Sequence, residues 1–315
     1  MKVSIIIPVY KVENLITRCL ESILQQSLQD FEVILVNDCT PDNSIEVAKK
    51  VINNDSRFTF IDHPKNLGLM RARYTGYKVA KGDYFVFCDS DDALPINSIE
   101  LLYNSIVTTN SDIVIANHIY IPNTGKEVIS NNRLSFGNDK VSVYKSLLNR
   151  ELTHSLWGKI YSNSLFKKFT YETYDNFTNS EDALLFYQLI NNVDKVSLID
   201  DVVYLYYQNS QSSTNLRLSD KAIENIIITQ KYRLRLAMEY VDIAKQFNFF
   251  VLKVISSLFQ SGYNRFLIID LCYKNNIEYI FSFDFINKVD DKCKSLLFWV
   301  YFNMYLKLFY KIKKR

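Results

Sequence analysis

Residues 84–92 of the chain read YFVFCDSDD, an apolar run that ends in a cluster of acids. The stretch from Tyr84 to Asp89 has the aromatic and apolar composition of a buried strand. Asp89, Asp91 and Asp92 fall within four positions, where their carboxylates repel one another and lose hydration if they are buried. We therefore expect these acids either to bind a cation at the end of a strand or to form an exposed turn that caps the next helix.

Strands and helices are predicted to alternate through the first hundred residues. Buried strands are expected at 3–10, 31–37, 58–61 and 84–89, and helices at 15–24, 45–52 and 69–81, with Gly82 ending the last helix. This alternation predicts an α/β fold with a mainly parallel central sheet. Ligands of such sheets collect beyond the carboxyl ends of the strands, where Tyr10, Asp38 and residues 63–68 lie with the acidic cluster.

The rest of the chain is predicted to change character twice. A helix at 97–109 and a strand at 112–120 continue the first pattern, and a mixed region follows at 123–217. From Leu218 onward the apolar spacing is helical throughout. We therefore expect one α/β domain over 1–217 and a helical region over 218–315.

The composition argues against two kinds of binding site, a glycine-rich phosphate loop and a nucleic-acid surface. The 315 residues include 7 glycines, and neither G-x-G-x-x-G nor G-x-x-x-x-G-K-[ST] occurs, so a phosphate site built from glycine-rich backbone is not expected. The net charge is +3, and the ending KIKKR carries four positive charges. Since the basic charge is concentrated in that tail, the sequence does not indicate a nucleic-acid partner.

The cysteines and the first residues indicate the compartment. Five cysteines without a C-x-x-C pair favour reduced thiols over a disulfide framework or a zinc site. The beginning MKVSIIIPVY has the composition of a strand, not of a signal peptide. A cytoplasmic location is the expectation.

The acidic cluster itself favours a hard divalent cation. Carboxylate ligands without neighbouring histidine or cysteine suit Mg²⁺ or Mn²⁺, and Mg²⁺ commonly shares one or two protein carboxylates with phosphate oxygens. Two other classes of metal-carboxylate site fit the sequence less well. A phosphatase of the haloacid-dehalogenase type carries its D-x-D on the first strand, whereas this cluster follows the fourth. A Toprim-type nuclease needs an upstream Glu and a basic groove, and neither stands out.

The N-terminal two thirds of the chain resemble family 2 glycosyltransferases of the inverting, bacterial surface-polysaccharide type, which have a GT-A fold. The resemblance extends from residue 3 to about 215. It is carried by SIIIPVYKVENLITRCLESILQQSLQDFEVILVNDCTPDNS, NLGLMRARYTGYKVAKGDY, FCDSDD, LWGKIYSNSLF, SED and YLYYQNSQSST, in that order. It implies that 1–112 is a nucleotide-binding half and 113–217 an acceptor-facing half.

The resemblance implies a donor site for a nucleotide sugar, with a UDP-sugar as the expected donor. Pro8, Val9 and Tyr10 would lie along the nucleoside, and Asp38 would accept a hydrogen bond from the base. Arg73 would contact the diphosphate, which suits the planar fork of a guanidinium.

The acids of the cluster would then have different roles. Asp91 is the expected ligand of Mn²⁺ or Mg²⁺, and Asp89 is expected at the ribose or the metal. Asp92 is a further candidate whose role stays open.

On the acceptor side, the resemblance implies that Asp182 is the catalytic base, with Glu181 as a neighbour that shares its setting. Asp182 would take a proton from an acceptor hydroxyl as that oxygen attacks the anomeric carbon. Trp157, Lys159 and Tyr206 are further candidates in the landmarks downstream. The acceptor would be a glycan or a lipid-linked saccharide, and the alternative is a catalytically weak scaffold that binds a nucleotide or a sugar.

The last stretch, SLLFWVYFNMYLKLFYKIKKR at 295–315, is apolar with a basic end. Its apolar part is shorter than the roughly 20 residues that span a bilayer. It is expected either to lie in the inner face of the cytoplasmic membrane, to pack as a terminal helix, or to form a homodimer contact.

Overall fold

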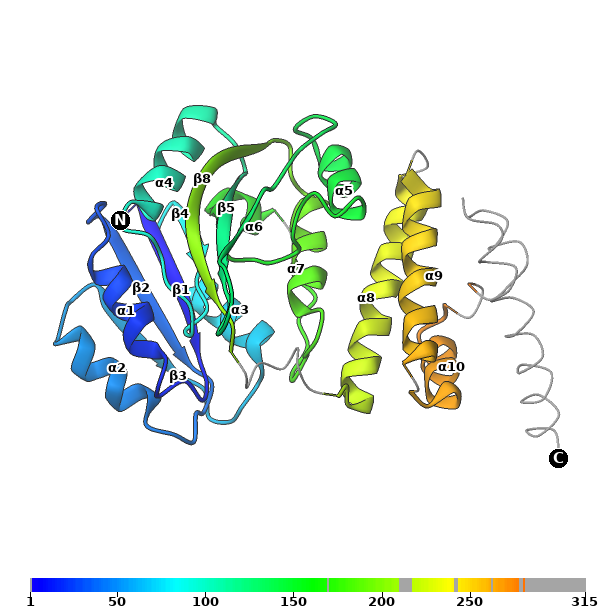
Figure 1. The fold of residues 1–315 in the computed structure, drawn as a ribbon, viewed down its shortest axis with the longest axis horizontal. Helices are drawn as coiled ribbons and strands as arrows, with labels where there is room; N and C mark the ends of the chain where they lie inside the picture. Colours follow the sequence, from blue (N-terminus) through cyan, green and yellow to red (C-terminus); the bar gives the residue numbers. More distant parts are fainter. Residues whose placement is uncertain are drawn as a thin grey trace. The chain divides into compact units, whose positions relative to one another are not determined.

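The computed structural model describes residues 2–168, 170–209, 217–240, 243–261, 263–277 and 280. The chain divides into two compact units, Met1–Arg217 and Leu218–Arg315 (Figure 1). The segment 295–315, with its expected membrane or dimer contact, lies outside the described residues.

The first unit contains a sheet of eight strands. The strands are β1 (Val3–Val9), β2 (Phe31–Asn37), β3 (Phe58–Asp62), β4 (Tyr84–Phe87), β5 (Ile113–Ile121), β6 (Val128–Ser130), β7 (Lys159–Ser162) and β8 (Val196–Tyr207). The helices are α1 (Ile16–Leu24), α2 (Ser44–Ile52), α3 (Leu69–Val79), α4 (Ser98–Thr109), α5 (Lys140–Leu148), α6 (Asn163–Lys167) and α7 (Glu181–Ile190). The predicted α/β class is confirmed.

The sheet is parallel in its first half and mixed in its second. Its order is β3-β2-β1-β4-β7-β5-β6, and β8 pairs with β5. The strands β1 to β4 are parallel to one another, whereas β7 runs antiparallel to both of its neighbours, β4 and β5. Consequently the start of β7 and the end of β8 reach the same edge of the sheet as the carboxyl ends of β1 to β4.

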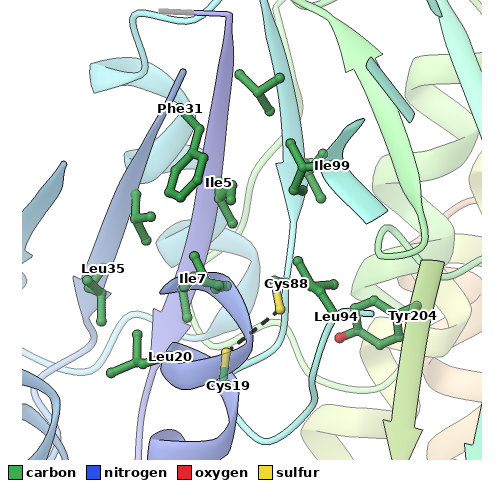
Figure 2. Close-up of a cluster of buried hydrophobic side chains, with 14 of the residues drawn as sticks. Ile5, Ile7, Cys19, Leu20, Phe31, Leu35, Cys88, Leu94, Ile99 and Tyr204 are labelled. Atoms are coloured by element: carbon green, nitrogen blue, oxygen red, sulfur yellow. Dashed lines mark hydrogen bonds between the residues drawn. The ribbon is translucent and has the colours of Figure 1, made fainter. Parts of the chain in front are cut away.

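One face of the sheet is covered by α1, α2 and α4. Alternate residues of β1, including Ile5 and Ile7, point to this face and pack with Cys19 and Leu20 of α1 (Figure 2). Cys88, just after β4, belongs to the same cluster, and its Sγ lies 3.8 Å from Sγ of Cys19. This apolar layer therefore holds Cys88, the residue just before the acidic cluster, against the sheet.

The opposite face carries α3 and an aromatic cluster. A Cβ atom placed on Gly76 of α3 would lie 2.4 Å from Cγ2 of Ile6, so the helix lies directly on β1 because this residue has no side chain. Phe85 of β4 packs against Phe166 of α6, with ring centroids 4.2 Å apart. The backbone of α3 is therefore held against the sheet one turn from Arg73.

Two predicted element ends are wrong by two residues, whereas the other predicted ends in the first 120 residues agree within one residue. The strand expected at 84–89 ends at Phe87, although the Cys88 N–H still donates to the carbonyl of Ile6 at 3.1 Å. The helix expected at 69–81 ends at Val79, because Ala80 adopts extended backbone angles, and Gly82 is not its cap.

A buried polar network takes the place of the expected glycine cap. Ser4 Oγ donates to Glu32 Oε1 at 2.6 Å and accepts from the Gly82 N–H at 2.9 Å. The Lys81 N–H donates to the same Glu32 oxygen at 2.6 Å. The turn that leads from α3 into β4 is thereby attached to β1 and β2, at the edge of the sheet opposite the acidic cluster.

The second unit consists of α8 (Asp220–Glu239), α9 (Ala244–Gln260) and α10 (Arg265–Lys274) in its described part. These helices share a core that includes Ile227, Val251, Ile255, Ile268 and Cys272. In the described part of the chain, no helix combines the length and apolar character needed to cross a membrane.

We expect Gly82→Ala to lower the free energy of unfolding by about 1–3 kcal/mol, the usual cost of overpacking. A Cβ atom at Gly82 would lie 2.7 Å from Ser4 Oγ, 2.8 Å from the Ser4 N and 2.9 Å from the Tyr84 carbonyl oxygen. Urea denaturation measures the change, with Lys81→Ala at the neighbouring exposed position as the control. A stability equal to that of the control variant would show that the turn does not need glycine.

Candidate active site

Acidic, basic and aromatic side chains meet at the edge of the sheet where β1 to β4 end. The acidic turn Asp89–Asp92 follows β4, the segment 155–158 leads into β7, and β8 ends here at Tyr207. The residue after β1, Tyr10, is 39% exposed, whereas the side chains of Pro8 and Val9 are buried within the strand. Of these three predicted nucleoside contacts, the structure places the Tyr10 side chain in solvent.

Both carboxyl oxygens of Asp92 accept hydrogen bonds from other parts of the protein. Its Oδ2 accepts from the Tyr204 hydroxyl at 2.7 Å, and its Oδ1 accepts from the Tyr207 N–H at 2.9 Å. Burial, followed by the charges of Asp89 and Asp91, raises the pKa of Asp92 to about 8. The carboxyl group joins the acidic turn to β8, which is a structural role.

Among the residues that the structure describes, Asp89 and Asp91 each have one carboxylate oxygen that accepts a hydrogen bond from a side chain and one that does not. Arg73 donates to Oδ1 of Asp89 at 2.8 Å, and Asn209 donates to Oδ2 of Asp91 at 3.0 Å. Within the described residues, Oδ2 of Asp89 and Oδ1 of Asp91 have no side-chain hydrogen-bond donor. Burial and the charge of Asp89 raise the pKa of Asp91. A cation between these two acids would remove that repulsion.

The same two acids do not make a complete metal cage. In the described part of the chain, no group of three or more His, Cys, Asp or Glu side chains could hold a metal ion. Mg²⁺ is commonly bound by one or two carboxylates together with substrate phosphate oxygens. Asp89 and Asp91 therefore fit a cation that is shared with a phosphorylated ligand.

Arg73 joins the acidic turn to the start of α7. Its Nη2 donates to Asp89 at 2.8 Å, and its Nη1 makes a hydrogen bond to Asp182. The Arg73 side chain is 1% exposed, whereas those of Asp89 and Asp182 are each 23% exposed. The guanidinium therefore lies beneath two carboxylates that solvent can reach, and a ligand would meet the carboxylates first.

Asp182 and Glu181 form an acidic pair at the start of α7. Burial raises the pKa of Asp182, while Arg73 and the Leu156 N–H stabilise its ionised form. Burial and the charge of Asp182 raise the pKa of Glu181 to about 7. The backbone leads into this pair through Asn179 and Ser180, whose φ angles of 57° and 95° are left-handed. Such angles are costly for residues other than glycine and tend to occur at functional sites.

Segment 155–157 is fixed by two residues on one face of β7. Lys159 Nζ, in a side chain buried to 1% exposure, donates to the Ser155 carbonyl at 2.6 Å. Tyr161 donates from its hydroxyl to the Leu156 carbonyl at 2.8 Å. Burial lowers the pKa of Lys159 to about 7. Lys159 thus contacts the protein backbone and holds the segment whose Leu156 N–H faces Asp182.

Trp157 and Tyr206 belong to an aromatic stack beside the acidic turn. Trp157 stacks on Tyr204 with ring centroids 4.4 Å apart and on Tyr206 at 5.3 Å. Both candidates are half-buried. Burial, together with the charges of the three acids of the turn, raises the pKa of Tyr206. The two predicted aromatics therefore lie in one group, close to the acids.

Asp38 organises the loop that follows β3. Its buried carboxylate accepts from the N–H groups of Leu67 and Gly68, each at 2.8 Å, and lies 2.8 Å from Nδ1 of His63. The Leu67 carbonyl in turn accepts from the Asn176 N–H at 2.7 Å, in the segment that precedes α7. Asp38 has these protein partners in the structure, and its contact with a base stays a prediction.

Two residues of the site, Arg18 and Tyr204, were not among the candidates predicted from the sequence. Arg18 of α1 donates to the Asp91 carbonyl, and its guanidinium lies 3.5 Å from the centre of the Tyr207 ring. Tyr204 donates to Asp92 and accepts from the Asp89 N–H at 3.1 Å. The alternation of side chains in YLYY could have placed Tyr204 on one face, but nothing nearby in the sequence points to its acidic partners.

Comparison with known proteins identifies the family of the chain. The pattern of Glycosyl transferase family 2 matches residues 4–175, more than half of the chain. Uncharacterized glycosyltransferase EpsJ of Bacillus subtilis is 30% identical over 247 residues, which cover 75% of this chain and 69% of that protein. Glycosyltransferase GlyA of Streptococcus pneumoniae is 31% identical over 215 residues, which cover 65% of this chain and 30% of GlyA.

A solved structure shows the same fold. S. aureus TarS 1-349, crystallised in complex with UDP-GlcNAc, aligns over 92% of this chain and 84% of its own, with a TM-score of 0.73 and 19% sequence identity. The fold is therefore of the TarS-like GT-A type. From the family pattern and the identity to EpsJ, we conclude that the chain is a glycosyltransferase that belongs to Glycosyl transferase family 2.

Proposed function

We propose that the chain transfers a sugar from a nucleotide-sugar donor to a hydroxyl of a glycan or lipid-linked acceptor, with inversion at the anomeric carbon. The observation that carries the proposal is the pairing of Asp89 and Asp182 with one buried guanidinium, which brings a donor-side acid and a base together. In this arrangement the two substrates meet between the acidic turn and the start of α7.

UDP is the expected nucleotide of the donor. The complex of S. aureus TarS with UDP-GlcNAc supports this choice, because that protein has the same fold. The exposed Tyr10 ring after β1 supplies a flat surface for a base, and Asp89, on the turn after β4, is the proposed contact for the ribose or the metal.

Asp89 and Asp91 would hold Mn²⁺ or Mg²⁺ together with the donor diphosphate. When bound, the cation neutralises negative charge on the departing nucleoside diphosphate. Asp92 supports this site indirectly, because its two hydrogen bonds fix the turn against β8. Arg18 holds the backbone of Asp91 from the other side.

Asp182 is the proposed base. An ionised carboxylate has about four positions for hydrogen bonds, and Arg73 and the Leu156 N–H account for two of them. Its 23% exposure leaves a path to an acceptor hydroxyl. The proton of that hydroxyl passes to Asp182 as the acceptor oxygen attacks, and the bond from the anomeric carbon to the diphosphate breaks.

The aromatic group of Trp157 and Tyr206 is the proposed contact for a sugar ring. Lys159 contributes through the position of segment 155–157. A cytoplasmic location beside the membrane would give the chain access to lipid-linked acceptors, and that location remains a prediction.

We expect Asp182→Asn to lower kcat/KM by about 10²- to 10⁴-fold, the usual contribution of a general base. Activity is measured as release of nucleoside diphosphate from a panel of UDP-, GDP- and TDP-sugars with Mn²⁺ or Mg²⁺ and candidate acceptors. The control is Asp175→Asn, an exposed acid that pairs with Arg71. Full activity of Asp182→Asn would exclude the base. Binding of UDP without any turnover would favour the scaffold alternative.

We expect Asp91→Asn to raise the Mn²⁺ concentration for half-maximal UDP binding by about tenfold or more, because a metal ligand is lost. Calorimetric titration with UDP at several Mn²⁺ concentrations measures this, and a chelator should abolish turnover. Asp83→Asn, an exposed acid just before β4, is the control. Undiminished turnover in chelator would contradict the metal role.

We expect Glu181→Gln to leave the acid limb of the kcat/KM profile in place and to alter the profile only above about pH 7. Burial and the charge of Asp182 raise the pKa of Glu181 to about 7, so Glu181 ionises after Asp182 and is neutral, as Gln is, on the acid limb. The profile is measured from pH 4 to about 9 and compared with Glu172→Gln, an exposed acid of the preceding segment. A shift of the acid limb in Glu181→Gln would show that Glu181 is already charged while the base ionises, which would contradict this order of ionisation.

A further inference from the structure

We infer that Arg73 is a positioning residue that sets the distance between the donor-side acid Asp89 and the base Asp182, and that it does not bind the donor diphosphate. This inference rests on the proposed function and changes the role that the family resemblance implies for this arginine. It deepens the proposal because one side chain, that of Arg73, sets the positions of two carboxylates.

The first support is the direction of the Arg73 hydrogen bonds. Nη2 donates to Asp89 Oδ1 and Nη1 donates to Asp182 Oδ1, so each terminal nitrogen of the fork serves a different acid. These acids are 93 positions apart in the sequence (182 − 89), on the turn after β4 and the start of α7. A guanidinium is rigid and planar, so two carboxylates bonded to its two ends have a fixed separation.

The second support is burial. With 1% exposure, the Arg73 side chain cannot meet a diphosphate that arrives from solvent, whereas the carboxylates above it can meet substrate. Its Nε is also buried and has no hydrogen-bond partner among the described residues. At 1% exposure, none of its nitrogens is accessible to a ligand that approaches from solvent.

The third support is the rigidity of the helix that carries Arg73. Gly76 holds α3 in direct contact with Ile6 of β1 and within 3.3 Å of Cγ2 of Val36 of β2, measured from an added Cβ atom. The guanidinium therefore starts from a backbone that is fixed to the centre of the sheet. Thr75, on the same helix, bonds His63 at 2.8 Å and so attaches α3 to the Asp38 loop.

The fourth support is charge. Asp89, Asp182 and Glu181 all stabilise the Arg73 cation, and no other Lys or Arg forms an ion pair with Asp89 or Asp182 in the described part of the chain. Removal of Arg73 would leave two acids close together without a shared cation. They would repel each other and separate, so the base and the donor would lose their alignment.

The test compares Arg73→Lys with Arg71→Gln. Lysine keeps the charge, but its three donors rotate about one nitrogen and lack the rigid planar fork, so it cannot hold both acids at the same fixed separation. Arg71 lies on the same helix, is 35% exposed, and pairs with Asp175 at 2.8 Å, so its variant controls for the loss of an ion pair on α3. Thermal unfolding shows whether each variant is folded.

We expect Arg73→Lys to impair turnover and to leave UDP binding nearly unchanged. Arg73→Lys should lower kcat by about 100-fold, the cost of a misplaced reacting group, while the Kd of UDP with Mn²⁺ changes by less than about threefold. Arg71→Gln should leave both unchanged. A loss of UDP affinity of tenfold or more in Arg73→Lys, with kcat preserved, would overturn the inference and identify a diphosphate ligand.

A double-mutant cycle with Asp182→Asn distinguishes this inference from the proposed function. If Arg73 acts through the base, Arg73→Lys should lower kcat by less than about threefold in the Asp182→Asn background, since residues that act as a unit are not additive. Full additivity would overturn the inference while the base stands. Wild-type activity of Asp182→Asn would instead remove the proposed base, and the UDP titration would still decide whether Arg73 binds the donor.

Discussion

A buried guanidinium must have anionic partners, and this requirement organises the site. An isolated charge in the interior is costly, so Arg73 at 1% exposure brings Asp89 and Asp182 to its two ends. In return, the carboxylates are held at the boundary between protein and solvent, where they can act on a ligand. The acidic turn after β4 and the start of α7 therefore meet at one point.

Contacts from β8, from α1 and from β7 hold the acidic turn and the start of α7 in place. Asp92 attaches the turn to β8 through Tyr204, and Arg18 holds the Asp91 carbonyl from α1. Lys159 and Tyr161 fix the segment that gives a backbone N–H to Asp182. Each of these groups satisfies a buried polar atom, so the network stabilises the fold and shapes the site at once.

The first half of the fold could be predicted because its signals are local. The strand 31–37 was located at both ends by its apolar run, and the acids were placed at the sheet edge by the order of strands and helices. The roles of individual acids could not be predicted, because their partners lie far away in the chain, as Tyr204 does from Asp92. The strand β7 has four residues, too few to show a period, so the antiparallel insertion beside β4 had no signal.

The position of β7 determines how the domain can be divided. β7 lies between β4 and β5 in the sheet, so residues from beyond position 113 complete the edge that residues 1–112 would otherwise expose at β4. A fragment ending at 112 would have an unpaired edge strand with Phe85 and Phe87 uncovered and a buried arginine without its second acid. Residues 1–112 and 113–217 thus belong to one cooperative folding unit, and neither half is a module that could be exchanged between proteins by cutting at that boundary.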